Sequence, residues 1–223
     1  MPFKTLARMG KSARKIEVPR DVLKNVPGRQ TRKMVEDIVL DVIKNRRTVR
    51  QFNSKDVTNS DLLNILNSGR YAPSAGNQQP WEFIVIRSKP MKEKIAHACY
   101  DQMWLTQAPI ILIVCTNMIL ATSKFKDRGE RLYSVQGVAA AIENMLIAAE
   151  SLGISSAWIG GFSERAISIL TQCPDYIRPC AVLAFGYAAE QPPVPPRQEL
   201  KEYTHSEYFG NLEIEKERNE EIY

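Results

Sequence analysis

Histidine and cysteine are scarce in this chain of 223 residues. The histidines are His97 and His205 alone, which argues against a zinc site and leaves no indication of a Ser-His-Asp arrangement. The cysteines form no Cys-x-x-Cys pair, and most lie in apolar or helical surroundings, where a small buried thiol is the usual case. We therefore expect all four to be reduced and structural, as in a cytosolic protein: Cys99, Cys115, Cys173 and Cys180.

Long hydrophobic runs are also missing. The longest spans residues 108–121 and is interrupted by Thr116 and Asn117, so it falls short of the roughly 20 residues that a membrane helix needs. Residues 1–30 lack the apolar centre of a signal peptide. No Gly-x-Gly-x-x-Gly sequence occurs, so a separate dinucleotide-binding unit is not indicated. These absences predict a soluble, cytoplasmic protein.

Acidic residues are few in the first fifty positions. Residues 1–50 hold 14 Lys and Arg against 5 Asp and Glu, a net charge of +9, whereas residues 51–223 hold 16 against 20, a net charge of −4. We interpret residues 1–33, which contain three prolines, as a basic N-terminal arm. The arm could be a partly ordered tail, pack across a dimer partner or bind nucleic acid. A basic run alone does not decide among these.

Residues 34–223 have the mixed helix and strand signals of one domain. Thr58 followed by Asp61 predicts a capped helix start, and Gly153 predicts the end of the longest helix. Residues 190–200 are rich in proline and are predicted to run extended over a surface. The expected elements are helices at 34–46, from residue 58, at 90–100, 134–152, 163–172 and 212–223, and strands at 81–87, 109–116, 154–160 and 180–188.

A cluster of cations lies at the end of the first of these helices. Three arginines fall within five residues, with a threonine among them, at 46–50. Guanidinium groups bind phosphate in a bidentate manner, and a hydroxyl adds one more donor. A solvated basic face is the alternative, which an isolated Arg-Arg pair would favour. The cluster predicts a phosphate-binding segment.

A second motif is the loop at 73–79, Pro-Ser-Ala-Gly-Asn-Gln-Gln, followed by Pro80 and Trp81. Its small residues leave room for close backbone approach, and Asn77 can both donate and accept a hydrogen bond. This composition suits a flat heteroaromatic ring, although an ordinary turn before a strand would use similar residues. We expect Trp81 to be a core residue.

These two motifs, followed by a Gly-Gly pair and a late arginine, resemble the flavin-binding signature of the nitroreductase family, FMN enzymes that reduce small acceptors. The resemblance covers about three quarters of the chain and ends near residue 197. It implies an α+β fold with a mixed central sheet flanked by helices, and a homodimer whose partner is wrapped by the C-terminal extension. The residues it assigns to FMN are Arg46, Arg47, Thr48, Arg50, Pro73, Ser74, Ala75, Asn77, Gly160, Gly161 and Arg197.

The resemblance also implies a role for each group. Arg46 and Thr48 would hold the phosphate and ribityl chain, and Arg197 would close over the phosphate. Arg50 would lie beneath the pyrimidine edge, where a cation favours the anionic reduced flavin. The loop that contains Asn77 would reach across the dimer interface.

The Gly-Gly pair would donate main-chain hydrogen bonds to the flavin N5 and O4 edge. Gly160 stands where many bacterial members carry glutamate, so a side chain that would line the substrate pocket is lost. Residues 101–133 form the expected specificity region. Its aromatic side chains could stack on a planar acceptor or cover the core: Trp104, Phe125 and Tyr133.

The function implied is ping-pong electron transfer from NADH or NADPH, through FMN, to a small aromatic, quinone or nitro acceptor. Two alternatives remain from the sequence. One is other chemistry on the same fold, such as reductive dehalogenation of the iodotyrosine deiodinase type or a dehydrogenase reaction. The other is a nucleic-acid or partner-binding protein that uses the basic arm.

Overall fold

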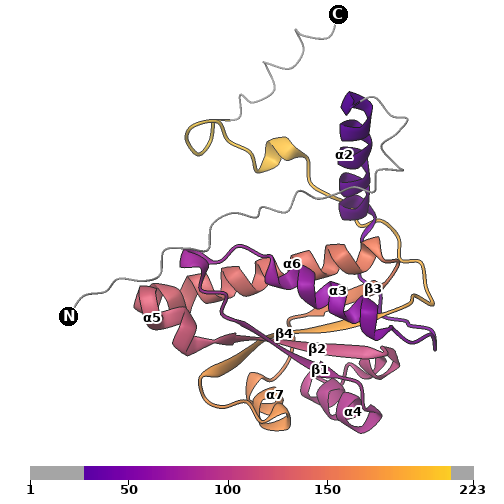
Figure 1. The fold of residues 1–223 in the computed structure, drawn as a ribbon, viewed down its shortest axis with the longest axis vertical. Coiled ribbons are helices and arrows are strands. Elements are labelled where there is room, and N and C mark those ends of the chain that lie inside the picture. Colours follow the sequence, from indigo (N-terminus) through magenta and orange to yellow (C-terminus); the bar gives the residue numbers. More distant parts are fainter. Residues whose placement is uncertain (1–27, 212–223) are drawn as a thin grey trace, which may run out of the picture.

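A four-stranded antiparallel sheet forms the centre of the computed structural model (Figure 1). The structure describes residues 28–211 of the chain, and the side chains of residues 37–211. The strands follow the spatial order β1-β2-β4-β3. Their bounds are Trp81–Ile86 for β1, Ile110–Asn117 for β2, Ser155–Ile159 for β3 and Ile177–Gly186 for β4.

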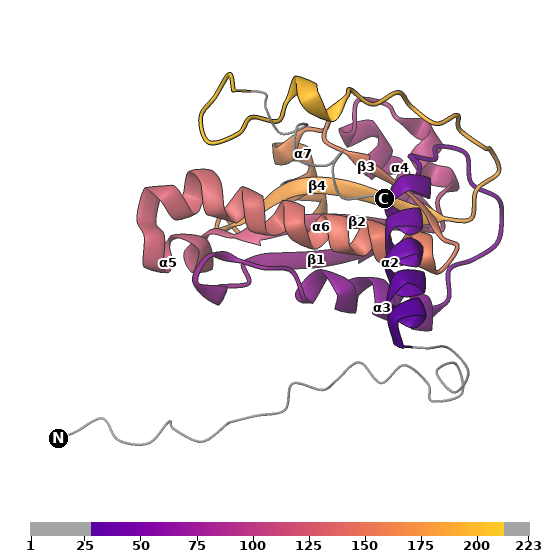
Figure 2. The same cartoon turned by 90° about the horizontal axis from the view of Figure 1, so that it is seen from above.

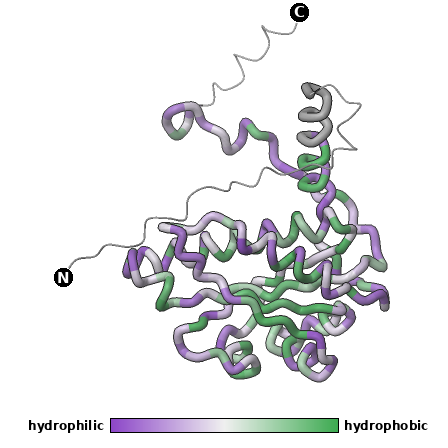
Figure 3. Tube along the Cα trace, viewed as in Figure 1, coloured by the Kyte–Doolittle hydropathy of each residue, from purple (hydrophilic) through white to green (hydrophobic). Residues whose placement is uncertain are grey.

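Helices cover both faces of this sheet (Figures 1 and 2). Side chains alternate along a strand, so Ile110, Leu112 and Val114 of β2 enter one core and the residues between them enter the other. Apolar residues accordingly concentrate in the strands (Figure 3). The helices of the first core are α3 (Asn59–Arg70) and α6 (Ser134–Ser151), and those of the second are α4 (Lys89–Ala98) and α7 (Glu164–Thr171).

The continuous apolar run at 109–116 is buried on both faces, as the sequence predicted. It pairs antiparallel with both neighbours, β1 and β4. Within the described part of the chain, the parallel pairing of the expected mixed sheet is limited to an isolated bridge between Thr48 and Ser156. The α+β class is confirmed, and its sheet is antiparallel in all three ladders.

The helix expected at 34–46 begins earlier than predicted. As α2 it spans Gly28–Asn45, so residues 28–33, which we had assigned to the basic arm, are helical. The rest of that arm and the helix expected at 212–223 lie outside the described residues. The helix α5 (Met118–Arg128) and the π-helical turn η3 (Gly129–Tyr133) were not predicted. Charged residues interrupt the regular spacing of apolar residues there. The helix is kinked at Lys126, whose φ is 47°.

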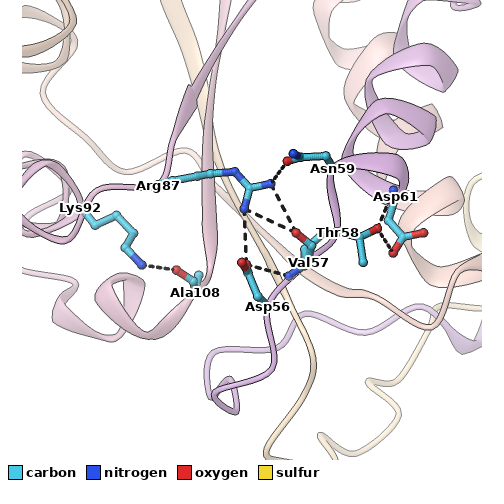
Figure 4. Close-up of polar contacts among 8 residues, drawn as sticks. All are labelled: Asp56, Val57, Thr58, Asn59, Asp61, Arg87, Lys92 and Ala108. Carbon is cyan, nitrogen blue, oxygen red and sulfur yellow. Dashed lines mark hydrogen bonds and ion pairs between the residues drawn. The ribbon is translucent and has the colours of Figure 1, made fainter.

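The predicted cap of α3 is present and is joined to the sheet (Figure 4). The Thr58 hydroxyl oxygen accepts from the Asp61 amide at 3.1 Å. Arg87, which follows β1, donates to the Val57 carbonyl at 3.3 Å and to Asn59 Oδ1 at 3.0 Å. The start of α3 is therefore fixed to the end of β1. Because a helix is rigid, this also fixes the end of α3, from which the loop at 73–79 begins.

One helical stretch, Met118–Ser151, is long and apolar enough to cross a membrane by length and composition alone. Its second part, α6, lies on the sheet, and Met145 and Leu146 are buried there. The apolar composition of α6 is that of a core helix. Gly153 ends it at φ +70°, the left-handed position that glycine adopts without strain.

Candidate functional site

A pocket of about 270 Å³ brings together the two basic segments that the sequence pointed to. One wall is Arg46, Arg47 and Thr48, at the end of α2. The other comes from about 150 residues later in the chain and carries Arg197. Prolines supply the rest of this second wall: Pro192, Pro193 and Pro195.

The first wall is held by the sheet edge. Thr48 forms a bridge with Ser156 at the beginning of β3, and the Val49 amide donates to the Ser156 carbonyl at 3.0 Å. Val49 is buried in the second core, the one that contains α4 and α7. Because neighbouring side chains of an extended segment point to opposite faces, burying Val49 leaves Thr48 on the pocket side.

The arginines of this wall differ in what else they contact. Arg46 is half-buried, and its Nε lies 3.9 Å from Glu143 Oε1 on α6. Arg47 donates through Nη1 to the carbonyls of Lys44 and Arg46, so it caps the end of α2 as well as lining the pocket. Each contact restricts the conformations of an arginine side chain before a phosphate binds, so less conformational entropy is lost on binding.

The second wall begins where the chain leaves β4. Phe52 bridges Ala188, the Ala189 amide donates to the Gln51 carbonyl at 2.8 Å, and the Asn53 amide donates to the Tyr187 carbonyl at 2.9 Å. These contacts place residues 187–190 beside residues 50–53. The proline-rich stretch then runs extended and exposed, as the sequence predicted.

Arg50 belongs to the same segment but does not line the pocket. It is exposed, and its backbone amide donates to Glu190 Oε1 at 2.6 Å. The cationic cluster is therefore divided: Arg46 and Arg47 face the pocket, and the Arg50 side chain projects into solvent.

The Gly-Gly pair lies at the far end of β3, beyond the last paired residue, Ile159. Gly160 and Gly161 are exposed, and a Cβ built on Gly160 would meet no atom within 4 Å. Gly160 is four positions after Ser156, which is about 13 Å along a strand. The edge of β3 thus runs from the arginine pocket to a stretch of accessible main chain.

The turn after α4 holds this stretch from one side, which the sequence did not indicate. Gln102 donates to the Gly161 carbonyl at 3.3 Å, and the Tyr100 hydroxyl donates to the Phe162 carbonyl at 3.3 Å. Tyr100 and Asp101 both adopt positive φ, 56° and 60°. Two consecutive residues in this conformation are unusual outside glycine and indicate a backbone constrained by its contacts.

The loop at 73–77 lies at the other end of the molecule, next to α5 (Figures 1 and 2). Gln78 donates to the Leu120 carbonyl at 2.6 Å and to the Ser123 hydroxyl at 2.7 Å. Gly76, Asn77 and Gln79 all have positive φ. The Ser74 hydroxyl accepts from the Gln79 amide at 2.9 Å and so closes the loop.

Asn77 is exposed at the tip of this loop. Ser74 packs toward Gly137, since a Cβ on that glycine would lie 3.7 Å from the Ser74 Cβ. The space beside Gly137, a residue of α6 without a side chain, is therefore filled by the chain's own loop. The loop residues that the resemblance assigned to FMN do not line the arginine pocket of their own chain. These residues are Pro73, Ser74, Ala75 and Asn77.

The three aromatic residues of the expected specificity region divide into two groups. Phe125 and Tyr133 form an edge-to-face pair with ring centroids 5.1 Å apart. Phe125 also lies beside Gly76, 3.2 Å from where a Cβ would be. Trp104 lies elsewhere. It is partly buried against the second core, and its ring centroid is 6.5 Å from that of Phe52. Trp104 therefore lies against the core, which is one of the two placements that the sequence left open.

The four cysteines, all within residues 28–211, are free thiols. Burial raises the pKa of Cys99 to about 12, and burial followed by the neighbouring Cys173 raises the pKa of Cys115. A thiol with a raised pKa carries little thiolate near neutral pH and is a poor nucleophile. These two cysteines fit the structural role expected of them.

Comparison with known proteins gives the same answer as the motifs. The family model described as "Nitroreductase family" matches residues 43–109 and 100–187. A putative NADH dehydrogenase/NAD(P)H nitroreductase of Archaeoglobus fulgidus is 33% identical over 156 residues, covering 68% of this chain and 86% of that protein. An FMN reductase [NAD(P)H] of Bacillus subtilis is 28% identical over 78% of this chain and 75% of its own.

Solved structures share the fold. The structure of NfrA2 from B. megaterium superimposes with a TM-score of 0.71 and 26% sequence identity, over 78% of this chain and 76% of that one. The family model spans more than half of the chain, and the arginine segment, the loop and the Gly-Gly pair all lie within the matched residues. The chain therefore belongs to the nitroreductase family, a family of oxidoreductases.

Proposed function

We propose that this protein is an FMN-dependent oxidoreductase that takes electrons from NADH or NADPH and passes them to a small aromatic, quinone or nitro acceptor. The observation that carries the proposal is the pocket in which Arg46, Arg47, Thr48 and Arg197 converge. Three guanidinium groups and a hydroxyl form a donor set suited to a phosphate monoester. The relative named as an FMN reductase supports the choice of FMN.

The residues present fit FMN along the edge of β3. Arg46, Arg47, Thr48 and Arg197 would hold the phosphate, and the exposed main chain at Gly160 and Gly161 would face the ring edge. When bound, FMN supplies the redox chemistry by accepting a hydride from the nicotinamide and delivering two electrons to the acceptor. The protein's part is to orient the ring and to place donors where negative charge develops.

The loop at 73–77 completes the site only if a second copy of the chain supplies it. In one chain it lies at the opposite end from the arginine pocket (Figure 2). α2 projects from the body and exposes four apolar side chains, 47–52% accessible, as expected of a helix that packs in an assembly. They are Ile38, Val39, Leu40 and Ile43.

We therefore propose a homodimer with two FMN sites at its interface. The exposed C-terminal stretch, which carries Leu200, Tyr203, Tyr208 and Phe209 on its surface, would wrap around the partner. A chain of this kind needs neither a membrane nor nucleic acid for its reaction, and we place it in the cytoplasm. A monomeric holo-protein in light scattering at micromolar concentration would contradict the dimer.

The direct test is cofactor content. Purified protein should be yellow, with flavin absorbance bands and close to one FMN per chain after reconstitution. NADH or NADPH should bleach these bands under anaerobic conditions. Protein that is colourless and takes up no added FMN would end the proposal.

The acceptor separates this function from the alternatives on the same fold. Phe125 and Tyr133 lie beside the loop, where an aromatic acceptor could stack on them. Reoxidation of the reduced enzyme should be followed in stopped flow with a nitroaromatic, a quinone and a halotyrosine. Fast reoxidation by the halotyrosine alone would favour a reductive dehalogenase.

A further inference from the structure

Within the described residues, Glu190 makes the last hydrogen bonds between the C-terminal stretch and the body of the domain. Its Oε1 accepts from two consecutive backbone amides, Arg50 at 2.6 Å and Gln51 at 3.1 Å. Beyond it, the hydrogen bonds described for residues 191–211 stay within that segment. A side chain two residues before the proline wall thus holds the main chain two residues after the arginine wall.

The chain between Glu190 and Arg197 is stiff. It contains Pro192, Pro193, Pro195 and Pro196, which restrict the backbone to an extended course. Seven residues of polyproline-like chain span about 22 Å. A stiff segment fixed at one end places its other end in a limited region, whereas a flexible one would not.

The charge of Glu190 argues against a direct role in binding an anion. A carboxylate beside a phosphate pocket repels a phosphate, so electrostatics alone would make removal of Glu190 favourable for binding. Its two amide partners instead make it a charge-assisted tether. The electrostatic and the tethering roles therefore predict opposite signs for the same substitution.

We propose that Glu190 is a positioning residue of the phosphate pocket: it fixes the proline-rich wall against residues 50–51 and so holds Arg197 opposite Arg46 and Thr48. With FMN as the ligand, this inference rests on the proposed function. The tether itself is a property of the chain without ligand. It can therefore be tested in both states.

The first experiment is FMN titration of the apo-protein, followed by quenching of flavin fluorescence. Glu190→Ala should weaken FMN binding by about fivefold or more, the loss expected for two hydrogen bonds. Glu190→Gln keeps an oxygen acceptor and should lose less. Glu199→Ala, an exposed glutamate in the same stretch, should match the wild type. Unchanged or tighter binding by Glu190→Ala would overturn the proposal.

A double-mutant cycle tests whether Glu190 acts through Arg197. Once Arg197 has been replaced by alanine, the further change Glu190→Ala should cost much less than it does alone. General damage to the fold would instead give additive losses, and additivity would overturn the proposal. Melting curves of each variant should accompany the cycle, so that a loss of fold is recognised as such.

Limited trypsin digestion tests the tether without FMN. Cleavage after Arg197 in the apo-protein should be faster in Glu190→Ala than in the wild type, whose residues around the cleaved bond are identical, as measured by mass spectrometry. Equal rates would refute the tether. If the wild type binds no FMN and Glu190→Ala is still cleaved faster, the proposed function is rejected and the tether is kept.

Discussion

The arginine pocket and the loop at 73–77 are held by the chain in different ways. The pocket rests on sheet-edge contacts: the bridge of Thr48 to Ser156, the bridge of Phe52 to Ala188, and the buried Val49. The loop rests on α5, a helix with a kink at Lys126 and a π-helical turn after it. The pocket is a continuation of the sheet, whereas the loop is a set of strained backbone positions held by side chains.

This difference indicates how the two regions contribute to binding. Positive φ at Asn77 and Gln79 stores strain that surrounding contacts must offset, and such positions concentrate at functional sites. The pocket carries the charged donors and should supply most of the affinity. The loop offers neutral amide groups and should supply orientation and selectivity.

The largest effect should come from the pocket. Arg46→Ala removes a charge-assisted contact to the phosphate, which is worth about 1.5–3 kcal/mol, or roughly tenfold to over a hundredfold in FMN affinity. Arg70→Ala is the matched control, because Arg70 lies outside the motif and contacts Asn67 and the Tyr71 ring. Equal FMN retention in the two variants would remove Arg46 from the site.

A smaller effect is expected when the loop is released from α5. Gln78→Ala deletes the hydrogen bonds to Leu120 and Ser123, so the loop should sample more conformations. A neutral hydrogen bond contributes about 0.5–1.5 kcal/mol, and we expect a loss of FMN affinity of about threefold to tenfold, equivalent to one such bond, because the loop contacts act on binding only indirectly. Hydrogen exchange of residues 74–79 should rise in parallel. Faster exchange with unchanged affinity would show that the loop is not part of the binding site.

The smallest effect concerns the electronic environment of the flavin. If the Arg50 charge acts on the pyrimidine edge, Arg50→Gln should lower the flavin midpoint potential by up to about 30 mV, which corresponds to 1.4 kcal/mol for two electrons. Arg50 is exposed, so solvent screening should bring the shift below this limit. FMN should still bind through the pocket. An unchanged potential in a redox titration would place Arg50 outside the reach of the ring.

Local signals predicted the elements well, because each rests on contacts close in sequence. Thr58 caps α3 and Gly153 ends α6, as expected of a hydroxyl and a glycine at those positions. α5 was missed because a kink and a π-helical turn leave no regular apolar spacing. The strand expected at 180–188 begins at Ile177. Arg178 and Pro179 are not typical strand residues, so the sequence did not show that pairing with β2 continues there.

The site was predictable in its residue types and less so in its partners. Arg46, Thr48 and Arg197 line one pocket, as the resemblance to the nitroreductase family implied. Trp104 was expected either to stack on an acceptor or to cover the core, and it lies against the core. The sequence could not decide between these because it does not show which way an aromatic side chain faces. Glu190 could not be found from the sequence, because its partners are backbone amides, which every residue has.

The central claim is that FMN lies between the arginine pocket of one chain and the loop of its partner. Mixed dimers of Arg46→Ala and Asn77→Ala chains test it, at an FMN concentration where neither homodimer retains the cofactor. A shared site predicts that each mixed dimer regains one intact site and binds one FMN per two chains. If both elements came from the same chain, every site would remain defective and the mixed dimer would bind none.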